Sequence, residues 1–286
     1  MQSLVGVLFD GFAYGTLLFL LSVGLSVTLG MMNFVNLAHC SFAMIGGYAA
    51  VTLVNSFGWP FLASLPVAFL AASFIAVILE KTLYRRLYRA SELDQCLFTI
   101  GIVFISVAAA AWFFGTVQQS VAMPDYLRGS IDFMGVHFAV YRIFLIAMSL
   151  AVTAFLVLSL EYTSFGAKVR AAVDNQRMAR GLGIDVDRAF MITFALGGGL
   201  AGLGGALSID IIGLDPAFAF TYLVYVLIVV AVGGLGSIGG SFAAAVVLGI
   251  SDMAGKYYFP WLGAFLIYLV MVALLMWRPA GMFGKR

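Results

Sequence analysis

Long apolar stretches alternate with short polar ones along almost the whole chain. An α-helix needs about 20 predominantly apolar residues to cross the hydrocarbon core of a bilayer, and most of these stretches approach that length. The pattern predicts nine membrane-embedded helices, over residues 4–30, 39–55, 61–82, 93–115, 140–160, 188–212, 220–232, 241–258 and 262–277. The second, seventh and eighth are short enough to be broken or re-entrant. The predicted fold class is an all-α, polytopic integral membrane protein with eight to nine transmembrane helices.

The composition agrees with this pattern. Of the 286 residues, 63% are hydrophobic and only 10% are charged, whereas soluble domains carry about 25% charged residues. Too few charges remain to cover a water-facing surface, and no continuous basic face predicts a nucleic-acid partner. The first apolar stretch lacks an early Lys or Arg and is too long for the core of a signal peptide, so we expect it to be retained as a membrane helix.

The basic residues predict the orientation, because short cytoplasmic loops carry an excess of Lys and Arg. Most of the 15 basic residues fall on one predicted side of the membrane, and these are Lys81, Arg85, Arg86, Arg89, Lys168, Arg170, Arg177, Arg180, Arg188, Arg278, Lys285 and Arg286. The other side keeps Arg128, Arg142 and Lys256. We therefore expect the first group and the C-terminus to be cytoplasmic and the N-terminus to be outside.

The chain is expected to form a single membrane domain over residues 1–286. An external loop, residues 116–139, separates a first half (1–115) from a second half (140–286). The second half contains the most charged part of the chain, the cytoplasmic loop 161–187.

A polar cluster interrupts the first two apolar stretches. It consists of Asn33, Asn36, His39 and Ser41, and the first three are spaced so that one helical face could hold them. Polar groups inside a membrane are costly unless they are hydrogen-bonded or face water. Two interpretations remain open: the side chains line a solute path, or they cap backbone groups where a helix is interrupted.

Neither histidine predicts a metal or catalytic site. No Cys, His or carboxylate cluster surrounds His39 or His137 in the sequence, so a metal-ligand set is not expected. Cys40 and Cys96 each lie in an apolar stretch and are interpreted as small buried hydrophobes. No cofactor is expected.

The cytoplasmic loop predicts one exposed helix of about 15 residues, roughly 22 Å long. Ser164 is the expected N-cap, and Gly181 or Gly183 the expected stop. One face is made of small residues, which suits docking into a groove of a partner protein: Val169, Ala172, Val173 and Ala179. The opposite face is charged, with Arg170 and Asp174 spaced as an i,i+4 pair.

A solvated linker or a membrane-surface helix is the alternative interpretation of this segment. In the docking interpretation the helix transmits force from a cytosolic ATPase, and the residues expected to do so are Lys168, Arg170, Asp174, Arg177, Arg180 and Gly181.

Glycine is abundant, with 32 residues, many of them inside apolar stretches. Small residues let membrane helices approach closely. The densest run, residues 233–240, predicts a non-helical turn at the cytoplasmic end of a helix, built from Gly233, Gly234, Gly236, Gly239 and Gly240.

Four acids lie in or beside apolar stretches, and these are Asp10, Asp210, Asp215 and Asp252. An ion-driven carrier would use such residues as coupling sites. All four fall near predicted outer helix ends, so loop or snorkelling positions explain them more simply. The chain lacks the G-x-x-x-x-G-K-S/T loop that cradles nucleotide phosphates. Any ATP is therefore expected on another chain, and no catalytic constellation predicts an enzyme.

Three stretches resemble the permeases of branched-chain amino-acid ABC importers and their urea and amide relatives. Residues 30–34, followed by Ala38, His39 and residues 44–48, resemble the G-x-x-N-F-A-H-G signature of the family. Here three residues separate Phe34 from Ala38, and Cys40 stands where glycine is usual. Residues 165–171 with 181–184 are similar to the cytoplasmic coupling loop of the family, and residues 233–240 to its late glycine turn. The likeness covers nearly the whole chain.

The resemblance implies a translocation subunit in a bacterial inner (plasma) membrane, and in the leading hypothesis this subunit works by alternating access. It implies a heterodimer with a second permease, two cytosolic ATP-binding subunits, an extracytoplasmic solute-binding protein, and docking of one ATPase by residues 168–184. The solute would be a branched-chain amino acid or a related small polar or organic-acid solute. An ion-coupled secondary transporter or channel is the alternative, and a structural membrane scaffold is a third interpretation.

Overall fold

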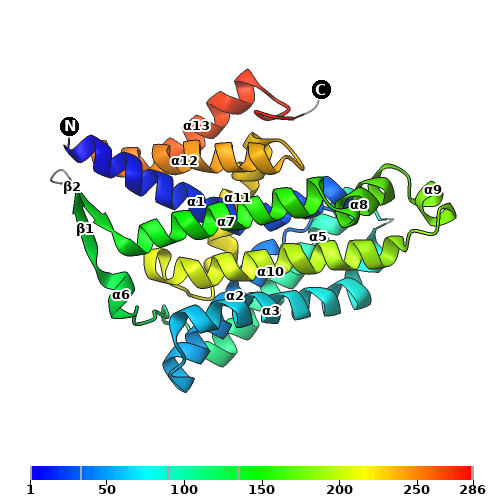
Figure 1. Cartoon of the computed structure of the whole chain (residues 1–286), viewed down its shortest axis with the longest axis horizontal. Coiled ribbons are helices and arrows are strands. Elements are labelled where there is room, and N and C mark those ends of the chain that lie inside the picture. Colours follow the sequence, from blue (N-terminus) through cyan, green and yellow to red (C-terminus); the bar gives the residue numbers. More distant parts are fainter. Residues whose placement is uncertain (1, 33, 89, 134–135, 285–286) are drawn as a thin grey trace.

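The computed structural model describes residues 2–32, 34–88, 90–133 and 136–284, and its regular structure is almost entirely helical (Figure 1). The long helices are α1 (Gln2–Met32), α2 (His39–Phe57), α3 (Phe61–Leu79), α5 (Glu92–Phe114), α7 (Val140–Glu161), α10 (Val186–Ile212), α11 (Phe218–Gly233), α12 (Ile238–Tyr258) and α13 (Gly263–Trp277). Short elements connect them: the π-helical η1 (Glu80–Tyr84), α4 (Arg85–Leu87), α6 (Asp125–Arg128), β1 (Ser130–Phe133), β2 (Val136–Ala139), α8 (Ser164–Asp174) and α9 (Gln176–Gly181).

All nine predicted apolar stretches coincide with helices. Within the described part of the chain, seven helical segments are long and apolar enough to cross a membrane, and these belong to α1, α2, α3 continued to Leu87, α5, α7, α10 and α12. Two further helices, α11 and α13, are apolar but shorter. The predicted all-α, polytopic membrane fold is confirmed.

The prediction of which helices are short was partly wrong. Helices α2 and α12 have 19 and 21 residues and are not short, whereas α11 has 16 and α13, predicted over residues 262–277, has 15. The residues that cap α2 and α12 explain why both helices are longer than predicted, because hydropathy does not report caps. Helix α2 continues to Gly58, whose φ of 67° ends it. Helix α12 begins early because the Ser237 hydroxyl accepts a hydrogen bond from the backbone N–H of Gly240.

Helix α10 forms the centre of the molecule and packs against α1, α2 and α3. Its glycines make this possible, because they let neighbouring backbones come close. A Cβ atom added to Gly46 of α2 would lie 2.3 Å from the Cα of Gly202 in α10. A Cβ added to Gly205 would lie 1.9 Å from the carbonyl oxygen of Ala43. Side chains at these crossings would force the helices apart.

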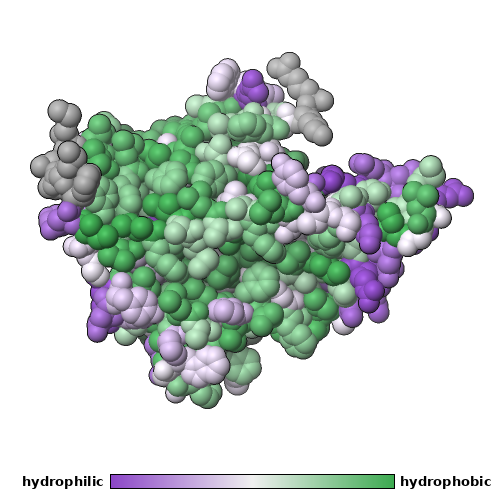
Figure 2. Space-filling model, in the orientation of Figure 1, coloured by the Kyte–Doolittle hydropathy of each residue, from purple (hydrophilic) through white to green (hydrophobic). Residues whose placement is uncertain are grey.

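The helices run roughly along the long axis and define two ends (Figure 1). The N-terminus and the β1–β2 hairpin lie at one end, called here the hairpin end; α8 and α9 project from the other, called here the α8–α9 end. Figure 2 shows hydrophobic residues over the middle of the visible face and hydrophilic residues gathered towards both ends. This distribution is that of a protein whose middle faces lipid.

The external loop predicted at residues 116–139 has a structure of its own. It contains α6 and the antiparallel pair β1–β2. Gln119 pairs with Leu214 in the α10–α11 connection, with N–O distances of 2.7 and 3.1 Å. Asp10 of α1 forms an ion pair with Arg142 of α7. These contacts tie the two halves of the chain together at the hairpin end.

The four acidic residues in or beside the apolar stretches differ in how deeply they are buried. Asp210 is exposed, Asp215 lies half-buried in the α10–α11 connection, and the side chain of Asp10 is 35% exposed. For Asp252 the snorkelling interpretation is wrong, because its side chain is 0% exposed. The i,i+4 neighbour Lys256 contacts it within the protein.

Candidate functional site

The segment between α1 and α2, residues 34–38, is not helical. Side chains accept hydrogen bonds from three of its backbone N–H groups. Val35 donates to the Gln95 Oε1 atom over 3.1 Å, Leu37 to the Thr99 Oγ1 atom over 3.2 Å, and Ala38 to the Asn36 Oδ1 atom over 3.1 Å. Gln95 and Thr99 both belong to α5, so α5 holds this interruption in place. We call residues 34–38 the α1–α2 break.

The predicted polar cluster lies at this break. Asn36, His39 and Ser41 are all buried, and Asn33 lies outside the described residues. Among the described residues, the Asn36 Nδ2 and His39 Nε2 atoms have no hydrogen-bond partner. The Ser41 hydroxyl pairs with that of Ser106 on α5 at 2.7 Å. The expectation of one helical face was wrong for Asn36 and His39, because residues 34–38 are not helical and α2 begins only at His39.

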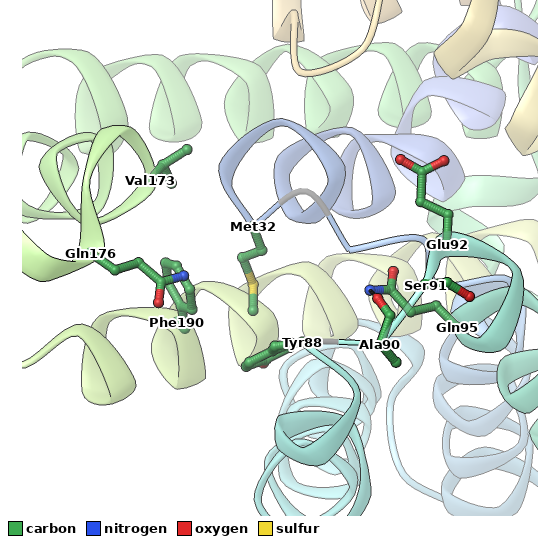
Figure 3. Close-up of a pocket in the computed structure, with 9 residues that line it drawn as sticks. All are labelled: Met32, Tyr88, Ala90, Ser91, Glu92, Gln95, Val173, Gln176 and Phe190. Atoms are coloured by element: carbon green, nitrogen blue, oxygen red, sulfur yellow. Dashed lines mark hydrogen bonds between the residues drawn. The ribbon is translucent and has the colours of Figure 1, made fainter.

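A cavity of about 440 Å³ adjoins the break at its α8–α9 side. It is lined by Met32, Tyr88, Ala90, Ser91, Glu92, Gln95, Val173, Gln176 and Phe190. Figure 3 shows Val173, Gln176 and Phe190 on one side, Ser91, Glu92 and Gln95 on the other, and Met32 and Tyr88 between them. Gln95 belongs to both features, since it lines the cavity and its Oε1 atom accepts from Val35 in the break. The cavity therefore joins the break to the α8–α9 segment.

The α8–α9 segment is two helices, not the single helix expected. Asn175 separates them with an extended backbone (φ −155°, ψ 95°), and its side chain accepts from the N–H of Met178 over 2.9 Å. The N-cap of α8 is Thr163 rather than Ser164. Asparagine favours such caps because its short side chain competes for backbone groups, which a composition-based estimate of helix length misses.

The small-residue face of this segment does not face a partner. Val169, Ala172 and Ala179 are almost completely buried against the chain's own helices, where α8 packs on α7 and α10. A Cβ added to Gly166 would lie 1.9 Å from the Leu160 carbonyl oxygen, so α8 presses closely on the end of α7. Arg170 donates to that same carbonyl. The expected Arg170–Asp174 pair is not among the ion pairs of the described residues.

The outward face of the α8–α9 segment is charged and also carries two apolar side chains. The residues expected to couple to an ATPase are all exposed: Lys168, Arg170, Asp174, Arg177, Arg180 and Gly181. Sequence analysis missed Met178 and Leu182, which are 67% and 80% exposed. They give the charged outward face two apolar contact points, and methionine is a residue enriched in protein–protein interfaces.

A chain of charges links this segment to α3. Arg180 contacts Asp187 at 2.8 Å, Asp187 lies 3.9 Å from Arg85, and the Arg85 Nε atom lies 3.6 Å from the Glu80 Oε1 atom. The Glu80 side chain is 0% exposed and accepts a hydrogen bond from the Tyr88 hydroxyl at 3.1 Å. Burial and the Glu80 carboxylate raise the pKa of Tyr88, which stays protonated as the donor. We call these residues the Glu80 network.

Glu80 begins the π-helical turn η1. Such turns insert an extra residue into a helix and are frequent at functional sites. Sequence analysis missed Glu80 because it stands at the boundary between an apolar stretch and a basic one. An acidic residue is usual at such a helix end and does not stand out.

The glycine run also lies at the α8–α9 end of α1. Only residues 234–237 leave the helical state; Gly233 ends α11, and Gly239 and Gly240 belong to α12. Gly234 and Gly236 have φ values of 96° and 79°, which favour glycine. The C-terminal segment packs onto the turn, since Met282 donates to the Val232 carbonyl over 2.7 Å.

Within the described residues, no group of three His, Cys, Asp or Glu side chains is close enough to hold a metal ion. The site consists of the buried polar α1–α2 break, the adjoining cavity and the projecting charged α8–α9 segment. A break and a cavity can form part of a path through the membrane, and an exposed charged segment can bind a partner.

Comparison with known proteins identifies the family. A model of the "branched-chain amino acid transport system / permease component" family matches residues 7–275. The chain belongs to this family. It is 29% identical to the probable branched-chain amino acid transport permease protein LivH of Methanocaldococcus jannaschii, covering 95% of this chain and 90% of the relative. It is 24% identical to LivH of Escherichia coli (strain K12), over 97% and 94% of the two chains.

A second kind of relative matches as well. The chain is 25% identical to the LivM permease protein of Escherichia coli (strain K12), covering 92% of this chain and 67% of the relative. Membership of a permease family makes the chain a multi-pass inner-membrane transport component and not an enzyme. It also favours the transport-subunit interpretation over the ion-coupled carrier and the scaffold.

Proposed function

We propose that this chain is one of two permease subunits of an ABC importer for branched-chain amino acids or related small polar solutes. The single observation that carries the proposal is the family match over residues 7–275. The similarity to both LivH and LivM of one organism supports a complex with a second, different permease. ATP hydrolysis and solute capture belong to further subunits: two cytosolic ATPases and an extracytoplasmic solute-binding protein.

In this proposal the α8–α9 end is cytoplasmic and the hairpin end faces the solute-binding protein. The basic residues gathered around α4, α8 and α9 support this orientation through the positive-inside rule. The whole chain acts as a single permease domain, with residues 116–139 as its external segment and residues 161–187 as its coupling segment.

The coupling segment docks one ATPase through its outward face. Met178 and Leu182 enter apolar pockets of the ATPase, and Lys168, Arg170, Asp174, Arg177 and Arg180 set the orientation around them. The Glu80 network supports transmission, because a displacement of α9 reaches Arg85 through Asp187, and Glu80 at the end of α3 through Arg85.

The solute path passes the α1–α2 break. The unpartnered Asn36 Nδ2 and His39 Nε2 atoms support this, because polar groups buried in a membrane protein usually line a path or pair with one another. Ser41 contributes a hydroxyl that shares its hydrogen bond with Ser106 of α5. Since α5 also holds the break through Gln95 and Thr99, a shift of α5 opens and closes the path.

Reconstitution of uptake tests the proposal. The chain is co-expressed with its partner permease, the ATPases and the binding protein, and leucine uptake into proteoliposomes is measured. We expect uptake that requires ATP and the binding protein and does not respond to an imposed sodium or proton gradient. Uptake by this chain alone, driven by such a gradient, would contradict the proposal.

A further inference from the structure

A second polar cluster lies away from the break, where α1, α11, α12 and α13 meet. It consists of Asp252 and Lys256 on α12, surrounded by tyrosines from the three neighbouring helices, which are Tyr14, Tyr222, Tyr225 and Tyr268. We call it the Asp252 cluster. None of its residues contributes to the break, the cavity or the coupling segment.

Asp252 is the buried member of the cluster. Its side chain is 0% exposed, and its Oδ2 atom accepts a hydrogen bond from the Lys256 Nζ atom at 2.5 Å. Its Oδ1 atom has no hydrogen-bond partner among the described residues. A buried carboxylate oxygen with nothing to accept from is destabilising, and ionisable residues inside membrane segments are usually kept for function.

Lys256 is the accessible member. Its side chain is 50% exposed, and the Nζ atom lies 5.4 Å from the centre of the Tyr14 ring. An ammonium group has three hydrogen-bond donors, and within the described residues Asp252 accepts from Lys256. The cluster thus offers one unfilled acceptor beside donors that remain free.

The tyrosines form the wall of the cluster. The rings of Tyr222 and Tyr225 are 5.7 Å apart, and those of Tyr225 and Tyr268 are 6.2 Å apart, so the row connects α11 to α13. All three tyrosines are half-buried, so part of each ring is accessible, whereas Asp252 behind them is completely buried. Tyrosine rings attract cations to their faces, and their hydroxyls donate to anions.

A comparison inside the molecule separates this pair from an ordinary ion pair. Asp10 and Arg142 also pair at the hairpin end, but both side chains are about one-third exposed, at 35% and 33%. Neither Asp10 oxygen is buried without a partner in the described part of the chain. Stabilisation alone would not require the complete burial of Asp252, because buried ion pairs stabilise little more than apolar residues of similar size.

We propose that the Asp252 cluster recognises the charged head group of a zwitterionic amino acid as it crosses the membrane. The ammonium group of the solute pairs with Asp252 Oδ1 and the tyrosine faces, and its carboxylate pairs with Lys256. The two charge pairs then lie antiparallel, which compensates all four charges without water. This inference rests on the proposed function and adds a specificity site to it.

The test uses the complete complex with its partner permease, ATPases and binding protein in proteoliposomes. The variants are Asp252→Asn and Lys256→Gln, and Asp10→Asn is the matched control. Leucine uptake and ATP hydrolysis stimulated by the binding protein are measured on the same preparation. We expect both cluster variants to lose about tenfold or more of uptake, as when a charged hydrogen bond to the solute is lost, while stimulated ATP hydrolysis is retained.

The control should keep uptake within about twofold of the unmodified complex. Uptake within that range in both cluster variants would overturn the site, as would a parallel loss of uptake and ATP hydrolysis. If the complex with Asp252→Asn does not assemble, the result for Lys256→Gln decides whether the site exists. The Lys256 side chain is half-exposed, so its replacement should leave assembly intact. Failure of the unmodified complex to take up leucine with ATP would instead overturn the proposed function.

Discussion

Gly236 in the turn between α11 and α12 lies directly against Gly30 in the last part of α1. A Cβ atom added to Gly30 would come within 2.1 Å of the Gly236 Cα atom, and one added to Gly236 within 2.6 Å of the Gly30 Cα atom. Two stretches of chain that are far apart in sequence therefore touch through backbone alone, at the point where α1 leads into the α1–α2 break.

Gly30→Ala and Gly236→Ala should both destabilise the protein. Each methyl group overlaps backbone atoms, and Gly236 also has a φ of 79°. We expect a loss of about 1–3 kcal/mol for each, the usual cost of overpacking. The thermal midpoint of the purified complex, followed by fluorescence-detected size exclusion, measures it.

The matched control is Gly239→Ala. Gly239 lies in α12 with no atom within 4 Å of an added Cβ. The change should therefore alter stability by less than about 0.5 kcal/mol. A similar loss in all three variants would mean that close approach at Gly30 is not the cause.

The outward face of the coupling segment predicts an effect on assembly. If the proposed docking holds, Met178→Glu and Leu182→Glu should reduce the amount of ATPase that co-purifies with the permeases, because each puts a charge in place of an exposed apolar contact residue. We expect a loss of about tenfold, corresponding to one interface anchor of more than 1 kcal/mol. Ile131→Glu, at an exposed position of β1 on the hairpin end, is the control and should co-purify normally. Normal ATPase recovery with both variants would argue against docking at this face.

Two acidic residues of the Glu80 network, Glu80 and Asp187, should differ in their contribution to stability. Glu80→Ala removes a fully buried carboxylate and leaves the Tyr88 hydroxyl without its acceptor, so we expect a loss of about 3 kcal/mol. Asp187→Asn weakens a pair whose side chains are about half-exposed and should cost less than about 1 kcal/mol. Thermal unfolding of both variants checks the order. Equal losses would mean that burial does not govern this network.

The α1–α2 break predicts a difference between two changes at one position. Thr99→Val removes the hydroxyl that accepts from the Leu37 N–H while keeping the shape of the side chain. Leaving that backbone group unsatisfied should cost about 1–3 kcal/mol. Thr99→Ser retains the hydroxyl and should be close to the unmodified protein in thermal midpoint and in leucine uptake. The account of the break is wrong if the two variants behave alike.

The helices could be predicted from the sequence because each needs a long apolar run, and these runs are unmistakable in a chain with 10% charged residues. The ends of the helices could not, because they depend on single caps such as Ser237 and Asn175. The spacing of apolar residues along a helix also does not reveal which other element packs on its apolar face. Val169, Ala172 and Ala179 pack on the chain's own helices, and only the fold shows this.

The candidate site, too, could be predicted only in part. The unusual polar residues Asn36 and His39 pointed to the break, but their supports Gln95 and Thr99 lie on a helix 60 residues away and carry no local signal. Asp252 was noticed but interpreted as a snorkelling or loop residue, and Glu80 was missed, both for a different reason. Both sit near helix ends in the sequence, where acids are ordinary, and only burial distinguishes them.

The most direct test of the central claim is to purify the tagged chain from its native membranes and identify its partners by mass spectrometry. The account predicts a second permease and an ATPase in near-stoichiometric amounts. Recovery of the chain alone, stable and active for uptake in liposomes without ATP, would contradict it.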